Sequence, residues 1–116
     1  MKKRTKLHIR RYRHMLDSPA YRNLRPLARC LLEQLQIFHH PTNNGHIGID
    51  QRRAAKLLHS SRKSIAKAFN HLRLNGFIKL SEDYSPNSKA RHWILTFETY
   101  NGKEATHDWM EWQPPN

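Results

Sequence analysis

Apolar residues recur every three or four positions along the first two thirds of the chain, which is the period of an amphipathic α-helix. The strongest run covers residues 25–40, where Pro26 suits the first turn of a helix. A weaker run covers residues 7–16, and Ser18 with Pro19 marks the start of a short helix after it. The pattern therefore predicts a core helix preceded by short helical segments. The apolar positions expected to face the interior in these runs are Ile9, Tyr12, Leu16, Leu27, Leu31, Leu35 and Phe38.

Two further helices are predicted on either side of a tight turn. Asp50 is placed to cap the first, over residues 51–59, and Ser61 to cap the second, over residues 61–75. Gly76 ends the second helix, because glycine can adopt the left-handed conformation that closes a helix. The positions expected to be buried are Ala54, Leu57 and Leu58 in the first helix and Ile65, Ala68, Phe69 and Leu72 in the second.

Alternating apolar and polar residues, the period of a β-strand, occupy three other stretches. Residues 46–50 predict a short strand, and residues 77–80 and 91–97 predict a hairpin joined by a loop over 81–90. The hairpin and the short strand together predict a three-stranded sheet, and the chain as a whole an α+β fold that is mainly helical. The hairpin residues expected in the core are Trp93, Leu95 and Phe97.

Positive charge is concentrated in the first two thirds of the chain. The 116 residues carry 21 Lys and Arg against 9 Asp and Glu, a net charge of +12. Residues 1–81 hold the whole surplus, whereas residues 82–116 are acidic on balance. So basic a chain suggests an anionic polymer or an anionic surface as partner. We divide the chain into a basic N-terminal arm (1–6), a main domain (7–100) and an acidic tail (101–116), whose Trp109 and Trp112 either pack on the domain or contact a second subunit in a homodimer.

The single cysteine and the absence of long apolar runs bear on location. Cys30 excludes an internal disulfide, which fits a reducing compartment, and its place in an apolar stripe predicts a packed thiol. No run of about 18 apolar residues is present to span a membrane, and no apolar segment follows the basic start as in a signal peptide. We therefore expect a cytoplasmic, nucleoid-associated protein with no membrane partner.

Residues 50–78 resemble the helix-turn-helix of bacterial winged-helix regulators. The small residues Ala54 and Ala55 occupy the places where that family lets its recognition helix approach, although His59 stands where the turn usually has a small residue. The recognition-helix pattern is matched by Ser61, Ile65, Ala68, Phe69, Leu72 and Gly76. The resemblance implies a winged helix-turn-helix with a three-stranded wing sheet and extra N-terminal helices.

A wider stretch of the chain resembles small helix-turn-helix proteins of bacterial mobile elements, namely prophages, plasmids and integrative elements. The segments that carry this resemblance are MLDSPAYRNL, NNGHIGI, NGFI, HWILT and ATHDWMEW. It implies a transcriptional regulator or a replication-control factor that binds specific sequences of double-stranded DNA.

A helix can read the major groove with short or basic side chains near its N-terminus, as the polar face of residues 61–75 provides. Arg62 is the first candidate for base readout, because a guanidinium can donate two hydrogen bonds to guanine, and its loss is expected to relax sequence preference. The predicted recognition residues are Ser61, Arg62, Lys63, Ser64, Lys67, Asn70 and His71, and the predicted backbone contacts are Arg52, Arg53 and Lys56.

Two other basic groups are candidates for phosphate or minor-groove contact. The N-terminal arm group comprises Lys2, Lys3, Arg4, Lys6, Arg10 and Arg11, with a solvated tail as the alternative. The wing group comprises Asn87, Ser88, Lys89 and Arg91; nearby Glu82 and Asp83 would repel phosphate, so wing contact stays open.

Two alternatives come from other classes of protein. One turn of the sequence contains three histidines, His39, His40 and His46, which suggests a metal-dependent nuclease as an alternative. However, the histidines do not have the usual spacing of zinc ligands, and the sequence has no phosphate-loop or nucleophile motif. We therefore expect no enzyme activity, no metal and no cofactor. RNA binding would use the same charge but calls for exposed aromatic residues on a sheet.

Overall fold

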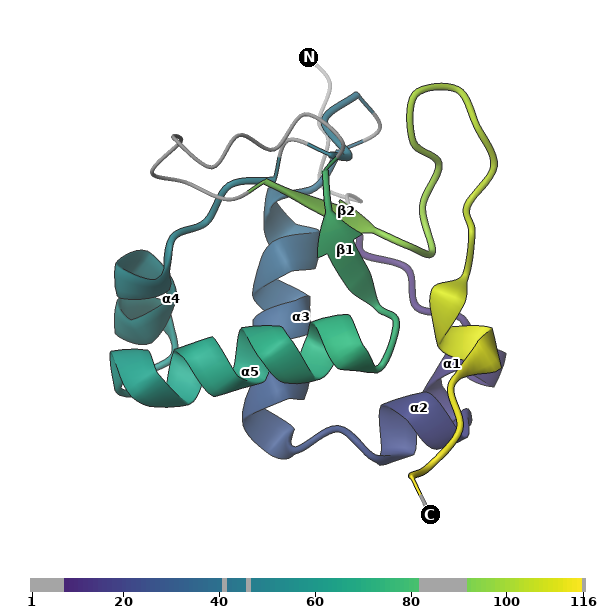
Figure 1. The fold of residues 1–116 in the computed structure, drawn as a ribbon. Helices are drawn as coiled ribbons and strands as arrows, with labels where there is room; N and C mark the ends of the chain where they lie inside the picture. Colours follow the sequence, from purple (N-terminus) through teal and green to yellow (C-terminus); the bar gives the residue numbers. More distant parts are fainter. Residues whose placement is uncertain (1–7, 41, 46, 82–91, 116) are drawn as a thin grey trace.

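The structure is a computed structural model that describes residues 8–40, 42–45, 47–81 and 92–115. The predicted α+β class, mainly helical, is confirmed (Figure 1). Within the described residues no helix is both long and apolar enough to cross a membrane. The elements follow the order α1 (Arg13–Leu16), α2 (Pro19–Arg22), α3 (Pro26–Phe38), α4 (Gln51–Leu57), α5 (Arg62–Leu74), β1 (Ile78–Leu80), β2 (Trp93–Leu95) and a 3-10 helix η1 (Asp108–Glu111).

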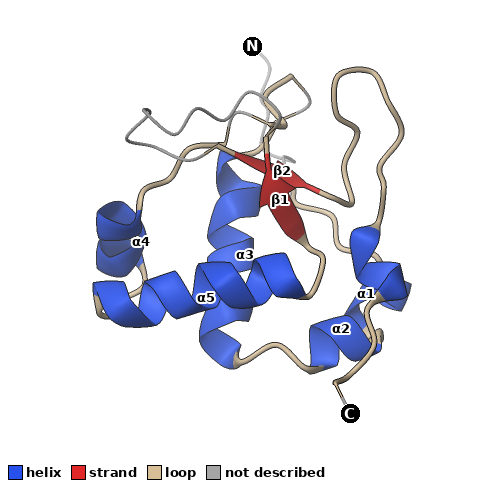
Figure 2. Ribbon diagram, in the orientation of Figure 1, coloured by secondary structure: helices blue, strands red, loops and turns tan. Residues whose placement is uncertain are grey.

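Helices α3, α4 and α5 form the centre of the molecule. Figure 1 shows α5 crossing over α3, with α4 lying near the N-terminal end of α5 and the two strands above its C-terminal half. Both α3 and α4 pack against α5. Figure 2 shows how small the sheet is beside the helices. The core side chains with no exposed surface include Leu31, Leu32, Leu35, Ala54, Ile65, Leu72, Phe77 and Leu95.

The predicted helix starts are confirmed by their capping hydrogen bonds. The side chains of Ser18, Asp50 and Ser61 each accept a hydrogen bond from the backbone N–H three residues further on, at 3.1, 2.7 and 3.1 Å. Such caps satisfy N–H groups that the first helical turn leaves without a partner. Because each cap involves residues only three positions apart, the starts of α2, α4 and α5 can be predicted from the sequence.

The end of α5 turns sharply at Gly76. Its φ is +87°, and a Cβ atom at this position would lie 2.7 Å from the backbone nitrogen of Trp109. Glycine is therefore needed at this position for two reasons: the left-handed conformation of the backbone and the close approach of the C-terminal segment.

The predicted hairpin is confirmed, whereas the described residues form a two-stranded sheet and do not confirm the third strand. β1 and β2 pair antiparallel, with Ile78 opposite Leu95. On the other edge of β2, Ile47 forms an isolated bridge, in which the N–H of Trp93 donates to its carbonyl at 3.0 Å. The next N–H on that edge, of Leu95, donates to the side chain of Asn44 at 2.8 Å. A buried amide side chain thus takes the place of the backbone that a third strand would supply.

The first predicted helix is also wrong in its start and in its buried face. α1 begins at Arg13, and Ile9, Tyr12 and Leu16 are 47, 36 and 36% exposed. The buried side chain is Met15. Residues before α1 lie along the end of α3, where the Gln36 side chain donates to the carbonyl of Arg10 at 3.3 Å. This attachment replaces the first turns of the predicted helix.

Two other burial predictions are wrong. Leu57 is 42% exposed, because α4 contacts the core through Ala54 and the partly buried Leu58. Cys30 is exposed as well, because the buried stripe of α3 runs through Leu31 and Leu35 and leaves position 30 on the opposite side.

The acidic tail packs on the domain through Trp109. Only 3% of this side chain is exposed, and its ring stacks on Phe77 at a centroid distance of 6.3 Å. Trp112 is partly buried against the same core. Of the two alternatives from the sequence, packing therefore holds for both tryptophans, and the expected core position of Trp93, Leu95 and Phe97 is confirmed.

Candidate nucleic-acid interface

The outward face of α5 is polar and largely basic. Ile65, Ala68, Phe69 and Leu72 turn inward, as predicted. The predicted recognition residues Ser61, Arg62, Lys63, Ser64, Lys67 and Asn70 are exposed, whereas His71 is half-buried. Leu74, 60% exposed, adds an apolar group at the C-terminal end of this face.

A hollow lies on one flank of α5, between this helix, the start of α4 and β2. Its volume is about 510 Å³, and its basic groups are Arg52, Arg62 and Arg73. Phe69 and Trp93, whose rings stack 5.6 Å apart, line it from the core side. We name this surface the α4 hollow.

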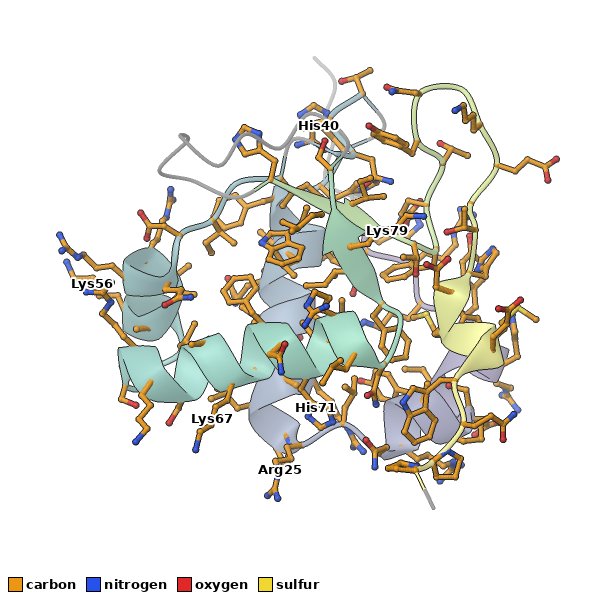
Figure 3. All side chains as sticks on the ribbon, in the orientation of Figure 1. Arg25, His40, Lys56, Lys67, His71 and Lys79 are labelled. Atoms are coloured by element: carbon orange, nitrogen blue, oxygen red, sulfur yellow. The ribbon has the colours of Figure 1, made fainter. Side chains whose placement is uncertain are left out.

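A second hollow lies on the opposite flank of α5, between this helix and the start of α3. Its volume is about 640 Å³, and its basic groups are Arg25, Lys67 and His71. Figure 3 shows these three side chains near one edge of the molecule. We name this surface the α3 hollow. Since Asn70 lines both hollows, they border the same exposed strip of α5.

In the part of the chain that the structure describes, no ion pair neutralises the positive charge on the two flanks. In the described part of the chain the ion pairs are Arg22 with Asp17 and Lys79 with Asp108, neither of which involves α4 or α5. The acidic residue of the α4 hollow is Asp50, and its carboxylate already accepts the capping hydrogen bond of α4. Both hollows therefore favour an anionic ligand.

His71 is held by a hydrogen-bond network behind the α3 hollow. Its Nε2 lies 3.0 Å from Oδ1 of Asn23, which also accepts a hydrogen bond from the side chain of Asn75 at 3.0 Å. Burial lowers the pKa of His71 below its usual value of 6.5, and the positive charge of Arg25 lowers it further. The imidazole is therefore mostly neutral at pH 7.

Asn70 and Arg73 form a pair on the exposed strip. Nη2 of Arg73 donates to Oδ1 of Asn70 at 2.7 Å. Reading adenine would use both the oxygen and the nitrogen of the amide. The predicted role of Asn70 thus requires Arg73 to move away from this oxygen.

The predicted backbone contacts of α4 divide into two groups. Arg52 lines the α4 hollow, and Lys56 is exposed and extends away from the core in Figure 3. Arg53 instead places its guanidinium 4.8 Å from the ring centre of Phe38, near the end of α3. Arg53 is thereby held on α3 by a cation–π contact.

The arm residues that the structure describes lie apart from α5. Arg10 borders a third hollow with Ile9, Ile37 and His39, to which neither α4 nor α5 contributes. Arg11 donates to the side chains of Gln36 and Tyr21, and its guanidinium is partly buried. The other predicted arm residues, Lys2, Lys3, Arg4 and Lys6, and the predicted wing residues, Asn87, Ser88, Lys89 and Arg91, lie outside the described residues.

Sequence reasoning missed Arg73 and Arg25. Arg73 follows Arg62 by 11 positions, three turns of helix, so the helical period alone would have placed both on one flank. Arg25 precedes α3 and reaches α5 only through the packing of the two helices. No local pattern indicates that contact.

The histidine cluster gives no metal site among the described residues. His39 is half-buried, and burial lowers its pKa while Glu98 opposes that shift and His40 adds to it. The ring of His40 instead hydrogen-bonds the hydroxyl of Thr42 at 3.0 Å, and His46 lies outside the described residues. No group of three His, Cys, Asp or Glu side chains in the described ranges is arranged to hold a metal ion.

No protein-family model, no curated protein and no solved structure matches this chain.

Proposed function

We propose that the protein binds specific sequences of double-stranded DNA by inserting α5 into the major groove. The observation that carries this proposal is the exposed strip of α5 with a basic hollow on each flank. The major groove is about 12 Å wide and is bordered by one phosphate backbone on each side. A helix in that groove brings one flank to each backbone, so the α4 hollow and the α3 hollow each meet a strand.

We further propose that α3, α4, α5 and the hairpin act as a winged helix-turn-helix. The capped helix α4, the turn at His59 and the capped helix α5 support this assignment. His59 has φ of +53°, so this turn adopts the left-handed conformation that the family usually gives to a small residue. In the described residues, the bridge between Ile47 and Trp93 occupies the position at which the third strand of such a fold would pair with β2.

Duplex DNA is favoured over RNA by the aromatic residues of the hairpin. Trp93 and Phe97 are buried, at 4 and 2% exposure. Sheet-based recognition of single strands needs aromatic rings that bases can stack on. Neither Trp93 nor Phe97 therefore offers an exposed ring on which a base could stack.

The biological role that we propose is transcriptional regulation or replication control of a bacterial mobile element. The sequence resemblances and the excess of positive charge support it, and they also support a cytoplasmic location on the nucleoid. The proposal includes a homodimer, in which each subunit would bind one of two half-sites on the DNA.

The test is a binding titration against random-sequence duplexes and genomic fragments at two salt concentrations, with and without Mg²⁺. We expect selective retention of certain fragments that survives the higher salt concentration, and no nicking. Uniform binding that is lost at the higher salt concentration would contradict sequence specificity, since phosphate contacts alone weaken steeply with salt. Mg²⁺-dependent nicking would favour a metal-dependent nuclease, and preference for single-stranded RNA would favour an RNA-binding protein.

A further inference from the structure

The α3 hollow joins three groups that are distant in sequence. Arg25 comes from the connection before α3, and Lys67 and His71 come from successive turns of α5. Ser64 lines the same hollow one turn earlier. Among the residues that the structure describes, no Asp or Glu lines it. The side chains that can carry charge here are therefore two permanent cations and one imidazole.

The hydrogen bonds behind the hollow fix which nitrogen of His71 carries the proton in its neutral form. Nδ2 of Asn75 donates to the backbone carbonyl of Ala20 at 2.8 Å, which identifies this atom as the amide nitrogen. The same nitrogen lies 3.0 Å from the Asn23 side chain, so the Asn23 atom in the network is the oxygen. An oxygen acceptor at 3.0 Å requires Nε2 of His71 to be the donor.

The other ring nitrogen, Nδ1, then has a lone pair in the neutral imidazole. A phosphate oxygen is also an acceptor, so neutral Nδ1 and a phosphate repel each other. Once Nδ1 is protonated, it becomes a donor and the ring carries a positive charge. Because Asn23 already holds Nε2, protonation leaves the network behind the hollow intact.

We propose that the α3 hollow binds a phosphodiester group of the DNA backbone and that His71 takes up a proton when it does so. Arg25 and Lys67 supply the permanent charge, and protonated His71 adds a third positive group. This inference rests on the proposed function and assigns one strand of the duplex to this side of α5.

The direction of the pH effect follows from linkage. In the free protein, burial and Arg25 lower the pKa of His71, and Lys67 is the other cation that lines the hollow. A bound phosphodiester raises that pKa, because an opposite charge favours the protonated ring. The gain in DNA affinity is complete below the pKa of the free protein and is lost as the pH rises through the pKa of the complex. Each unit between the two values corresponds to about tenfold in affinity.

The test compares DNA affinity at pH 5.5 and 7.5 for the wild type and for His71→Gln. The glutamine amide can still donate to Asn23 but cannot take up a proton. When the pH falls, we expect the affinity of the wild type to rise more than that of His71→Gln, by a factor of up to about tenfold for a rise of one unit in the pKa of His71 on DNA binding. His14→Gln is the control for the other histidines, because His14 is exposed and lies beside Trp109, outside the α3 hollow.

A second measurement addresses the phosphate itself. Arg25→Gln should weaken binding to specific and random duplexes by the same factor and reduce the slope of log affinity against log salt by about one. The matched control is Lys103→Gln, which also removes one exposed positive charge but lies after β2. Titration with inorganic phosphate should leave the resonances of His71 unchanged at concentrations where a duplex shifts them, since the site is built for the DNA backbone.

The outcomes separate this inference from the proposed function. Specific DNA binding with equal pH dependence in the wild type and His71→Gln would overturn the inference and leave the proposed function standing. A loss of specificity, in place of a uniform loss, in Arg25→Gln would also overturn it. Failure of the wild type to bind any duplex at either pH would overturn both.

Discussion

At the scale of single residues, buried amide side chains hold together parts of the chain that sequence patterns treat as separate. Asn44 precedes a glycine, as is typical of a turn, yet its Nδ2 donates to the carbonyl of Thr99 at 2.8 Å and its Oδ1 accepts from the N–H of Leu95 at 2.8 Å. Asn75 precedes the glycine that ends α5, yet its side chain reaches Ala20 and Asn23. The turn propensity of asparagine is local and was predictable, whereas these partners depend on the assembled fold.

Replacing Asn44 by Ala should lower the free energy of unfolding by at least about 1–3 kcal/mol, because it leaves the buried N–H of Leu95 without a partner. Urea unfolding followed by circular dichroism measures this loss. Thr42→Ala in the same turn is the control and should change stability by less than about 0.5 kcal/mol, since Thr42 is exposed. Equal effects of the two substitutions would contradict the bridging role of Asn44.

Replacing Arg62 by Ala should relax sequence preference at one base pair, at about 1–3 kcal/mol for a lost bidentate contact with guanine. Arg62 lines the α4 hollow near the start of α5, where recognition helices contact bases. Selection from a random duplex pool, repeated with the variant, measures the preference position by position. Equal loss of affinity for specific and random DNA would mean that Arg62 contacts phosphate instead.

At the scale of elements, local signals predicted the capped helices and the hairpin, but not the start of α1 or the extent of the third strand. The caps of α2, α4 and α5 each need one side chain and a backbone N–H three residues away, so they can be predicted from the local sequence. The third strand was predicted from the alternation of Ile47 and Ile49, both of which are buried. Burial was thus predicted correctly, but the pairing is limited to the bridge between Ile47 and Trp93, because Asn44 binds the next N–H on that edge of β2.

The turn after α5 provides a test of how that helix is fixed to the tail. Gly76→Ala and Gly102→Ala both place a side chain at positive φ, which costs about 1–2 kcal/mol. Gly102 has no atom within 4 Å of an added Cβ, whereas at Gly76 the backbone of Trp109 lies 2.7 Å away. Thermal unfolding should therefore show Gly76→Ala to be less stable than Gly102→Ala by at least about 1 kcal/mol. Equal stability of the two variants would refute the close approach.

At the scale of the whole molecule, the acidic tail belongs to the core that supports α5. Trp109 packs on Phe77, which follows α5 directly in sequence. The composition of the tail separated it from the basic part of the chain, but composition does not report packing between distant segments. The charge distribution and the flank of α5 that carries Arg73 were predictable in the same way, whereas the approach of Arg25 to α5 was not.

Trp109→Ala should cost about 3–5 kcal/mol of stability, the range for removing a buried aromatic side chain. The control in the same 3-10 helix is Met110→Ala, because Met110 is 61% exposed and should contribute less than about 0.5 kcal/mol. Urea unfolding of both variants measures the difference. A small effect of Trp109→Ala would mean that the tail is dispensable for the domain.

The most direct test of the central claim is chemical footprinting of a selected duplex with a reagent that methylates guanine N7 in the major groove and adenine N3 in the minor groove. With α5 in the major groove, the wild type should protect guanine N7 within one short site, and Arg62→Ala should restore methylation at one of those guanines. Protection of adenine N3 alone, or no protection of the bound duplex, would contradict a major-groove role for α5.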